Sequence, residues 1–247
     1  MPYDDWTYQP SETLNENFVE RLKGFPREPE ILVYGARSAT ALAIRAWLKL
    51  YHRLSGIGRE HLPQTGSFVV VANHTSHLDT LMILSAFRMQ QLHRVFPAAA
   101  ADYFFSSVPR SIFTGIVINA LPFDRKKNSA ESLEVCRMLL ENDGNVLVIF
   151  PEGTRTSTGE TGQFKSGVAR LVAGTEIPVV PCWIEGGYTA WPKGARIPRP
   201  KRITLRFGAP RRFPDAVNDR DGWRGVCDNL REAVVGLGAV ARTEREP

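Results

Sequence analysis

The run from Val69 to Ala72 constrains the fold most, because this apolar stretch ends abruptly at a polar one, Asn73 to Asp79. The residues after it, Thr80 to Phe87, are mostly apolar and suit a helix. We therefore predict a strand, a turn and a helix in that order. Polar side chains at such a joint reach solvent at the edge of a sheet, which is a common setting for chemistry in α/β proteins.

His74 and Asp79 are the candidates for chemistry at this joint. They are five positions apart, so they can meet only if His74 precedes the helix and the chain bends back. Ser76 is then the expected N-cap, with Asp79 as the third helical residue. A carboxylate bonded to one ring nitrogen of His74 would fix the tautomer and leave the other nitrogen as a base. An ordinary capping box would also explain Asp79, and His77 could be the active ring instead.

Strands and helices alternate along the rest of the chain. This alternation predicts an α/β fold, a two-layer or three-layer sandwich with a mixed central sheet flanked by helices. The strand at 145–150 is almost wholly apolar, which suits a sheet covered on both faces. The expected strands are 67–72, 94–100, 116–123, 145–150, 177–184 and 202–207; the expected helices are 78–89, 129–141, 164–173 and one that includes 223–234.

The N-terminal part divides into a peripheral arm, residues 1–35, and the start of a single domain, residues 36–247. An amphipathic helix is expected over 38–54. It is either a surface helix packed on the core or an interfacial helix whose basic face meets anionic lipid. One face would carry Arg45, Lys49 and Arg53, and the opposite face Ile44, Trp47, Leu48, Tyr51 and Leu54.

Positive charge is concentrated near the C-terminal end of the predicted sheet. The net charge is +5, and the stretch 193–212 holds eight basic residues and no acidic one. Such a stretch suits phosphates, an anionic membrane surface, nucleic acid or an acidic carrier protein. It has neither interleaved aromatic residues nor a recognition motif, so nucleic acid is not an expected partner. The basic residues are Lys193, Arg196, Arg199, Lys201, Arg202, Arg206, Arg211 and Arg212.

The remaining composition bears on location and on excluded chemistries. The acidic N-terminus lacks the apolar segment of a secretory signal, and no apolar run is long enough to span a bilayer. Cys136, Cys182 and Cys227 are far apart, so buried thiols in a reducing compartment are expected. We expect a cytoplasmic protein, peripherally associated with the inner face of the membrane. The histidines show no metal-ligand spacing, and the absence of a G-x-S-x-G elbow argues against a serine hydrolase.

A second polar turn, Phe150 to Arg155, follows the strand at 145–150. Gly153 allows a sharp turn or a close approach to a ligand. Arg155 offers a planar, permanently charged fork for a phosphate or carboxylate, although a lone arginine on a loop is more often a surface residue. Arg125 follows the strand at 116–123, so it would converge with Arg155 and His74 if these strands are neighbours.

These motifs together resemble the PlsC-like glycerolipid acyltransferases, which include the 1-acyl-sn-glycerol-3-phosphate acyltransferases. Asn73 to Asp79 is similar to the family's N-H-x4-D motif, and Phe150 to Arg155 matches F-P-E-G-T-R. The resemblance covers roughly residues 55 to 210, with a motif core at about 67–186. The looser blocks are Leu121–Arg125, which lacks the glycine usually found near it, Phe164–Gly167 (F-K-x-G) and Ile177–Pro181. The family's frequent N-terminal transmembrane helices are absent from this sequence.

The resemblance implies acyl transfer without a cofactor, from acyl-CoA or an acyl-carrier protein as co-substrate. The acceptor would be a lysophospholipid, above all 1-acyl-glycerol-3-phosphate, which yields phosphatidic acid. His74 would be the general base, Asp79 would orient it, and Arg155 and Arg125 would bind the acceptor phosphate. The rest of the substrate-binding turn would be Phe150, Pro151, Glu152, Gly153 and Thr154. Two alternatives are another acceptor, an aminolipid or other lysolipid, and a catalytically silent lipid-binding protein.

Overall fold

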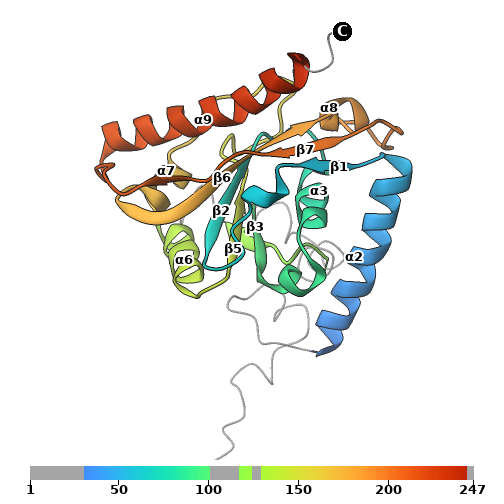
Figure 1. The fold of residues 1–247 in the computed structure, drawn as a ribbon, viewed down its shortest axis with the longest axis horizontal. Helices are drawn as coiled ribbons and strands as arrows, with labels where there is room; N and C mark the ends of the chain where they lie inside the picture. Colours follow the sequence, from blue (N-terminus) through green and yellow to red (C-terminus); the bar gives the residue numbers. More distant parts are fainter. Residues whose placement is uncertain (1–30, 101–116, 124–128, 244–247) are drawn as a thin grey trace, which may run out of the picture.

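The computed structural model describes residues 31–100, 117–123 and 129–243, which form a central sheet with helices on both sides (Figure 1). The strands lie in the order β1-β7-β6-β2-β5-β3-β4, and β8 pairs with β6 at the end that β7 leaves free. Their bounds are β1 Ser55–Ile57, β2 Phe68–Ala72, β3 Val95–Ala100, β4 Leu121–Phe123, β5 Val146–Ile149, β6 Thr175–Glu185, β7 Thr204–Phe207 and β8 Arg211–Phe213.

The sheet is mixed, as predicted. Strand β2 lies at its centre, parallel to β5 on one side and to β6 on the other. Strands β7 and β8 run antiparallel to β6. Because β2, β5 and β6 are parallel, their carboxyl ends meet at one edge, and the two polar turns after β2 and β5 become neighbours there.

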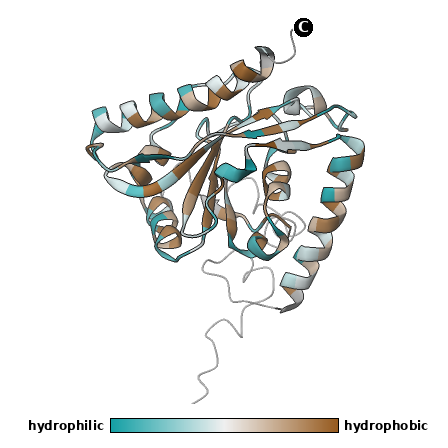
Figure 2. Ribbon diagram, viewed as in Figure 1, coloured by the Kyte–Doolittle hydropathy of each residue, from teal (hydrophilic) through white to brown (hydrophobic). Residues whose placement is uncertain are grey.

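Two separate cores give the molecule three layers. Alternate residues of β2 face opposite sides: Phe68 and Val70 join one apolar core, and Val69 and Val71 the other. Figure 2 shows these central strands coloured as hydrophobic. The three-layer form of the predicted sandwich is therefore the observed one. The first core is covered by α2 (Ile31–Tyr51), α3 (Asp79–Ala86) and the 3-10 helix η3 (Met89–Arg94), the second by α6 (Ser129–Glu141), α7 (Gly167–Val172) and α9 (Arg220–Thr243).

Helix α2 differs in two ways from the helix predicted over 38–54. It begins at Ile31, inside the range predicted for the N-terminal arm, and ends at Tyr51. Its Arg45 does not share an outer basic face with Lys49, because the guanidinium donates to the carbonyls of Leu84 and Phe87. These acceptors lie at the C-terminal end of α3, where unsatisfied carbonyls favour a cation.

Three other boundaries differ from the predicted ones by three residues or more. The strand expected over 116–123 is reduced to β4, since Val117 and Ile118 are helical and Asn119 takes a left-handed φ of 56°. The Asn119 amide donates to the carbonyls of His93 and Val95, which stabilises this bend. Helix α3 ends at Ala86 rather than 89, and α7 begins at Gly167 rather than 164.

Two further expectations can be compared with the described residues. Within the ranges given above, no helix combines the length and the apolar character that crossing a bilayer requires. All three cysteines are reduced and buried, as predicted. Burial raises the pKa of the Cys136 thiol to about 12, so this thiol is not suited to act as a nucleophile.

Candidate active site

The predicted contact between His74 and Asp79 is confirmed. Nδ1 of His74 lies 2.9 Å from Oδ2 of Asp79. The carboxylate is fully buried, whereas 21% of the His74 side chain is exposed. With Nδ1–H donating to the carboxylate, Nε2 is the basic nitrogen of the ring. The pair can therefore accept a proton from a molecule that approaches from solvent.

Asp79 also organises the turn that carries His74. Its Oδ2 accepts the backbone N–H groups of Thr75 at 2.6 Å and Ser76 at 2.8 Å, and Ser76 Oγ accepts the N–H of Leu78 at 3.1 Å. The bond from the Ser76 N–H to Asp79 is one half of the expected capping box, but Ser76 Oγ accepts the N–H of Leu78 rather than that of Asp79. The same carboxylate holds the imidazole. The predicted start of the helix is wrong by two residues, however. The N-cap of α3 is Leu78 rather than Ser76, so Asp79 is the first helical residue and not the third.

The turn after β2 and the turn after β5 are bonded to each other through His74. Its backbone N–H donates to Oε1 of Glu152 at 2.8 Å, and its carbonyl accepts the N–H of Thr156 at 2.9 Å. The His74 ring also stacks on Phe150, with centroids 4.2 Å apart. These three contacts fix both the backbone and the ring of His74.

The side chain of Glu152 accepts hydrogen bonds from backbone N–H groups of the protein itself. Its side chain is buried, and its second oxygen, Oε2, accepts the N–H of Gly162 at 2.9 Å. Both carboxylate oxygens are therefore occupied by amides of two different loops. This geometry favours an organising role for Glu152 over direct contact with a substrate.

Asn73, the first residue of the N-H-x4-D motif, joins the active-site turn to β6. Its side-chain Nδ2 donates to the carbonyl of Ile184 at 3.1 Å, and its Oδ1 accepts the N–H of the same residue at 2.7 Å. Asn73 is fully buried, so it has no access to a substrate. Its role at the site is to hold the end of β6 against the turn.

The turn after β5 carries the cationic side of the site. Gly153 has a φ of 71°, as expected for a sharp turn, and a Cβ there would lie 2.7 Å from Nζ of Lys165. Nη1 of Arg155 is buried and has no hydrogen-bond partner among the described residues. Thr154 is exposed, and Pro151 is buried, with its carbonyl accepting the N–H of Lys165.

Lys165 was missed as a candidate site residue, although the F-K-x-G block offered the signal for it. The other predicted cation, Arg125, lies outside the described residues.

His77 was the alternative to His74 as the active ring. Its side chain is exposed and its ring lies 5.1 Å from that of Trp191, whereas the carboxylate of Asp79 holds His74. Although this side chain is exposed, partial desolvation of the ring by its neighbours, and then the charges of Arg155 and His74, lower the pKa of His77. His77 is thus a neutral neighbour of the pair at neutral pH, on the side of Arg155.

The chain has relatives among known proteins. A family model described as Acyltransferase matches residues 53–185, more than half of the chain. A 1-acyl-sn-glycerol-3-phosphate acyltransferase from Chlamydomonas reinhardtii is 32% identical over 188 residues, covering 74% of this chain and 52% of that protein. One from Cocos nucifera is 36% identical over 103 residues, covering 40% of this chain and 33% of that protein. The chain thus spans about a third to a half of the length of these relatives.

The solved structures include one with the same fold. The crystal structure of the 1-acyl-sn-glycerophosphate acyltransferase PlsC from Thermotoga maritima matches with a TM-score of 0.60, covers 82% of each chain and is 24% identical. The fold is therefore shared, and the residues matched by the family model include both polar turns. The chain belongs to the Acyltransferase family.

Proposed function

We propose that this protein transfers an acyl group from a thioester to the free hydroxyl of 1-acyl-glycerol-3-phosphate, forming phosphatidic acid. The observation that carries the proposal is the His74–Asp79 pair, with Nε2 of His74 available at a partly exposed edge of the sheet. The names of the curated relatives support the choice of acceptor. The donor is acyl-CoA or an acyl-carrier protein.

In the proposed mechanism, Nε2 of His74 takes the proton of the acceptor hydroxyl while its oxygen attacks the thioester carbonyl. Asp79 stabilises the imidazolium that forms. The tetrahedral intermediate then collapses, the carbon–sulfur bond breaks, and the imidazolium returns the proton to the departing thiolate. The products are the new ester and a free thiol, and no covalent enzyme intermediate is needed because the thioester is already activated.

Arg155 and Lys165 are proposed to bind the acceptor phosphate. Arg155 belongs to the turn after β5, and the ammonium group of Lys165 lies against Gly153 of the same turn. Neither residue forms an ion pair among the described residues. A buried guanidinium nitrogen without a protein partner suits a charged oxygen of the substrate. Holding the phosphate there positions the neighbouring hydroxyl and lowers the entropic part of the barrier.

The first experiment measures thiol release from a long-chain acyl-CoA, and from an acyl-carrier protein, with and without 1-acyl-glycerol-3-phosphate. We expect release that requires the acceptor and that falls by about 100- to 10,000-fold in His74→Ala. Release without any acceptor would indicate a thioesterase. No release with either donor and a panel of lysolipids would favour the silent lipid-binding alternative.

Arg155→Ala separates binding from chemistry. We expect the KM for the phosphorylated acceptor to rise about tenfold or more, with a smaller effect on an acceptor without a terminal phosphate. Arg224→Ala is the matched control, because Arg224 is exposed on α9, where it pairs with Asp221 three positions away. An unchanged KM for both acceptors would contradict the phosphate assignment.

We also propose that the protein docks peripherally on an anionic membrane through one composite surface. The C-terminal end of α2 lies against the loop 192–202. Tyr51 Oη donates a hydrogen bond to the carbonyl of Pro198 at 3.0 Å, and the N–H of Ile203 donates to the carbonyl of His52 at 3.1 Å. Exposed cations and apolar tips are therefore neighbours on this surface, as in interfacial binding sites. Its cations are Lys49, Arg53, Lys193, Arg196, Arg199, Lys201 and Arg202, and its tips are Leu50, 80% exposed, and Ile197, 75% exposed.

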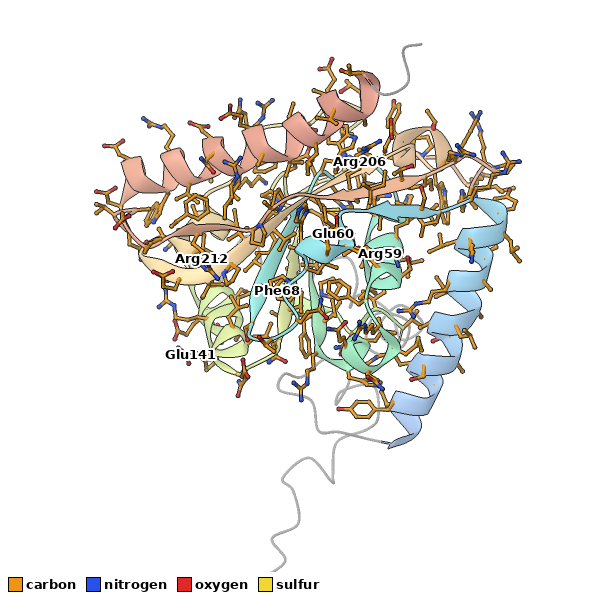
Figure 3. All side chains as sticks on the ribbon, viewed as in Figure 1. Arg59, Glu60, Phe68, Glu141, Arg206 and Arg212 are labelled. Carbon is orange, nitrogen blue, oxygen red and sulfur yellow. The ribbon has the colours of Figure 1, made fainter. Side chains whose placement is uncertain are left out.

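This surface differs from the basic stretch predicted over 193–212, which the fold divides. Arg206 lies on β7, Arg211 donates to Asn229, and Arg212 donates to the carbonyl of Glu176. Figure 3 shows Arg212 beside β6, at the opposite side of the molecule from α2. These three arginines therefore do not belong to the proposed docking surface.

Sedimentation with vesicles of phosphatidylcholine, with and without phosphatidylglycerol, tests the docking surface. We expect binding that needs the anionic lipid, weakens with salt and is lost in the double variant Leu50→Asp/Ile197→Asp. Val217→Asp is the control, since Val217 is similarly exposed, at 65%, before α9. Undiminished binding of the double variant would overturn the proposal. A salt-dependent KM for the donor alone would assign the cations to coenzyme A or to a carrier protein.

A further inference from the structure

The six residues that follow β6, from Gly186 to Trp191, contact the first active-site turn and the loop that follows the second. This 186–191 segment includes the short helix α8, Gly187–Ala190. It lies outside every motif found in the sequence. Its contacts suggest a role in holding the reactive pair, which we argue one residue at a time.

Gly187 packs directly on the pair's carboxylate. A Cβ at this position would lie 2.6 Å from Oγ1 of Thr75, 3.0 Å from Oδ1 of Asp79 and 3.3 Å from Cβ of Ser76. Gly187 is itself buried. Only the absence of a side chain therefore allows the segment to lie this close to Asp79.

The contact matters because Oδ1 of Asp79 has no other anchor. All three hydrogen bonds to this carboxylate use Oδ2, whereas Oδ1 is buried without a hydrogen-bond partner among the described residues. Oγ1 of Thr75 is likewise buried without a hydrogen-bond partner among the described residues. The rotation of the carboxylate about Oδ2 is therefore limited by packing, and Gly187 supplies part of that packing.

The rest of the segment is fixed to its surroundings on several sides. Tyr188 Oη donates to the carbonyl of Ser157 at 2.8 Å, in the loop that follows the second turn. Ser76, which belongs to the first turn, donates through Oγ to the carbonyl of Trp191 at 3.0 Å. Gly186 has a φ of 81°, and a Cβ there would lie 2.3 Å from the carbonyl oxygen of Arg202. The segment is thus held at both of its ends and at Tyr188.

We propose that Gly187 is a positioning residue, which sets the orientation of the Asp79 carboxylate towards His74 through the 186–191 segment. The inference rests on the proposed function, because it gives the pair a role in proton transfer. A methyl group at this position must displace Thr75, Asp79 or the segment. A displacement of about 1 Å near reacting groups costs on the order of 100-fold in rate.

The test compares Gly187→Ala, Thr75→Ala, the double variant of both, and Gly236→Ala as a control in open space on α9. In Gly187→Ala we expect kcat to fall about 10- to 100-fold, with the KM for both substrates within about twofold of wild type. Gly236→Ala should keep a kcat close to wild type, and Thr75→Ala is the reference against which the double variant is read. The double variant should recover part of the loss, because it lacks the atom that would lie closest to the new methyl group.

The melting temperature of each variant is measured alongside, so that lost fold and lost orientation are distinguished. A folded Gly187→Ala with wild-type kcat would overturn the inference, and so would a double variant no better than the single one. If Gly187→Ala does not fold, the double variant decides, and a kcat equal to that of Thr75→Ala would then refute the proposal. Absence of turnover in wild type would instead count against the proposed function.

Discussion

Oε1 of Glu152 accepts the backbone N–H of His74 at 2.8 Å, so a carboxylate from one active-site turn holds the main chain of the other. Asp79 holds the His74 ring in the same way, through Oδ2 at 2.9 Å. The two buried carboxylates thus have different tasks: Glu152 holds the backbone of His74, whereas Asp79 holds the imidazole and the backbone of the next two residues. Variants of each should therefore fail in different ways.

Glu152→Gln should weaken the support of His74 without removing it. The amide oxygen can still accept one of the two backbone N–H groups, but the amide nitrogen cannot accept the other, which leaves a buried donor without a partner. We expect a loss of about 1–3 kcal/mol in the free energy of unfolding and a lower kcat. Urea unfolding and steady-state kinetics check this. A variant as stable and as active as wild type would show that the two bonds contribute nothing.

Asp79→Asn should be the more severe change for turnover. It removes the negative charge that stabilises the imidazolium and disturbs the tautomer of His74. We expect kcat to fall by about 1,000- to 10,000-fold while the protein remains folded. Circular dichroism would establish the fold, and thiol release the rate. Retention of more than a tenth of the activity would exclude a role for Asp79 in orienting the base.

Two glycines of α9 should respond in opposite directions to alanine. A Cβ on Gly238 would lie 2.6 Å from the Trp183 ring, so Gly238→Ala should cost about 1–3 kcal/mol through overpacking against β6. Gly236 has nothing within 4 Å, so Gly236→Ala should stabilise the helix by about 0.5–1 kcal/mol. Urea unfolding of both variants checks the pair, and equal changes would contradict the packing argument.

His52 should make stability depend on pH. Its ring is fully buried and packs edge-on against the rings of Trp47 and Tyr51, and burial lowers its pKa. The unfolded chain, in which the pKa is about 6.5, therefore binds this proton more readily than the folded protein. The stability contributed by the neutral ring is fully present above about pH 6.5 and is lost as the pH falls through the lower, folded-state value.

Melting temperatures at pH 7.5 and pH 5 test this effect in wild type and in His52→Phe. We expect wild type to lose more stability between the two pH values than the variant does. The pKa values of His77 and His93 are also lowered by burial, so part of the dependence should remain in His52→Phe. Identical losses in the two proteins would show that His52 does not titrate on unfolding.

Local patterns were sufficient to predict an α/β sandwich, although not whether it has two or three layers, and the contact between His74 and Asp79. Apolar runs of strand length and a capping pattern depend on neighbours in sequence, so β2, β5, α6 and α9 lie close to where they were predicted. The bend that brings His74 back to Asp79 is equally local, since it is contained within six residues.

Contacts between distant segments could not be predicted in this way. The bonds of Glu152 to His74 and Gly162, and the packing of Gly187 on Asp79, depend on β5 and β6 lying on either side of β2. No local pattern specifies that order of strands. For the same reason Arg45 was assigned to an outer face, although the carbonyls that it satisfies lie 39 and 42 positions further along the chain.

The paired hydrogen bonds between Asn73 and Ile184 have a consequence for how the active-site turn can leave the sheet. The side-chain amide offers Ile184 the same donor and acceptor that the peptide group of a neighbouring strand would offer. The last pair of hydrogen bonds between β2 and β6 is thus made by the side chain of Asn73. Its main chain is therefore not held by β6 at this point and can turn away towards His74. Aspartate could not donate and leucine could do neither, so among residues of this size the position selects the amide for its resemblance to a peptide bond.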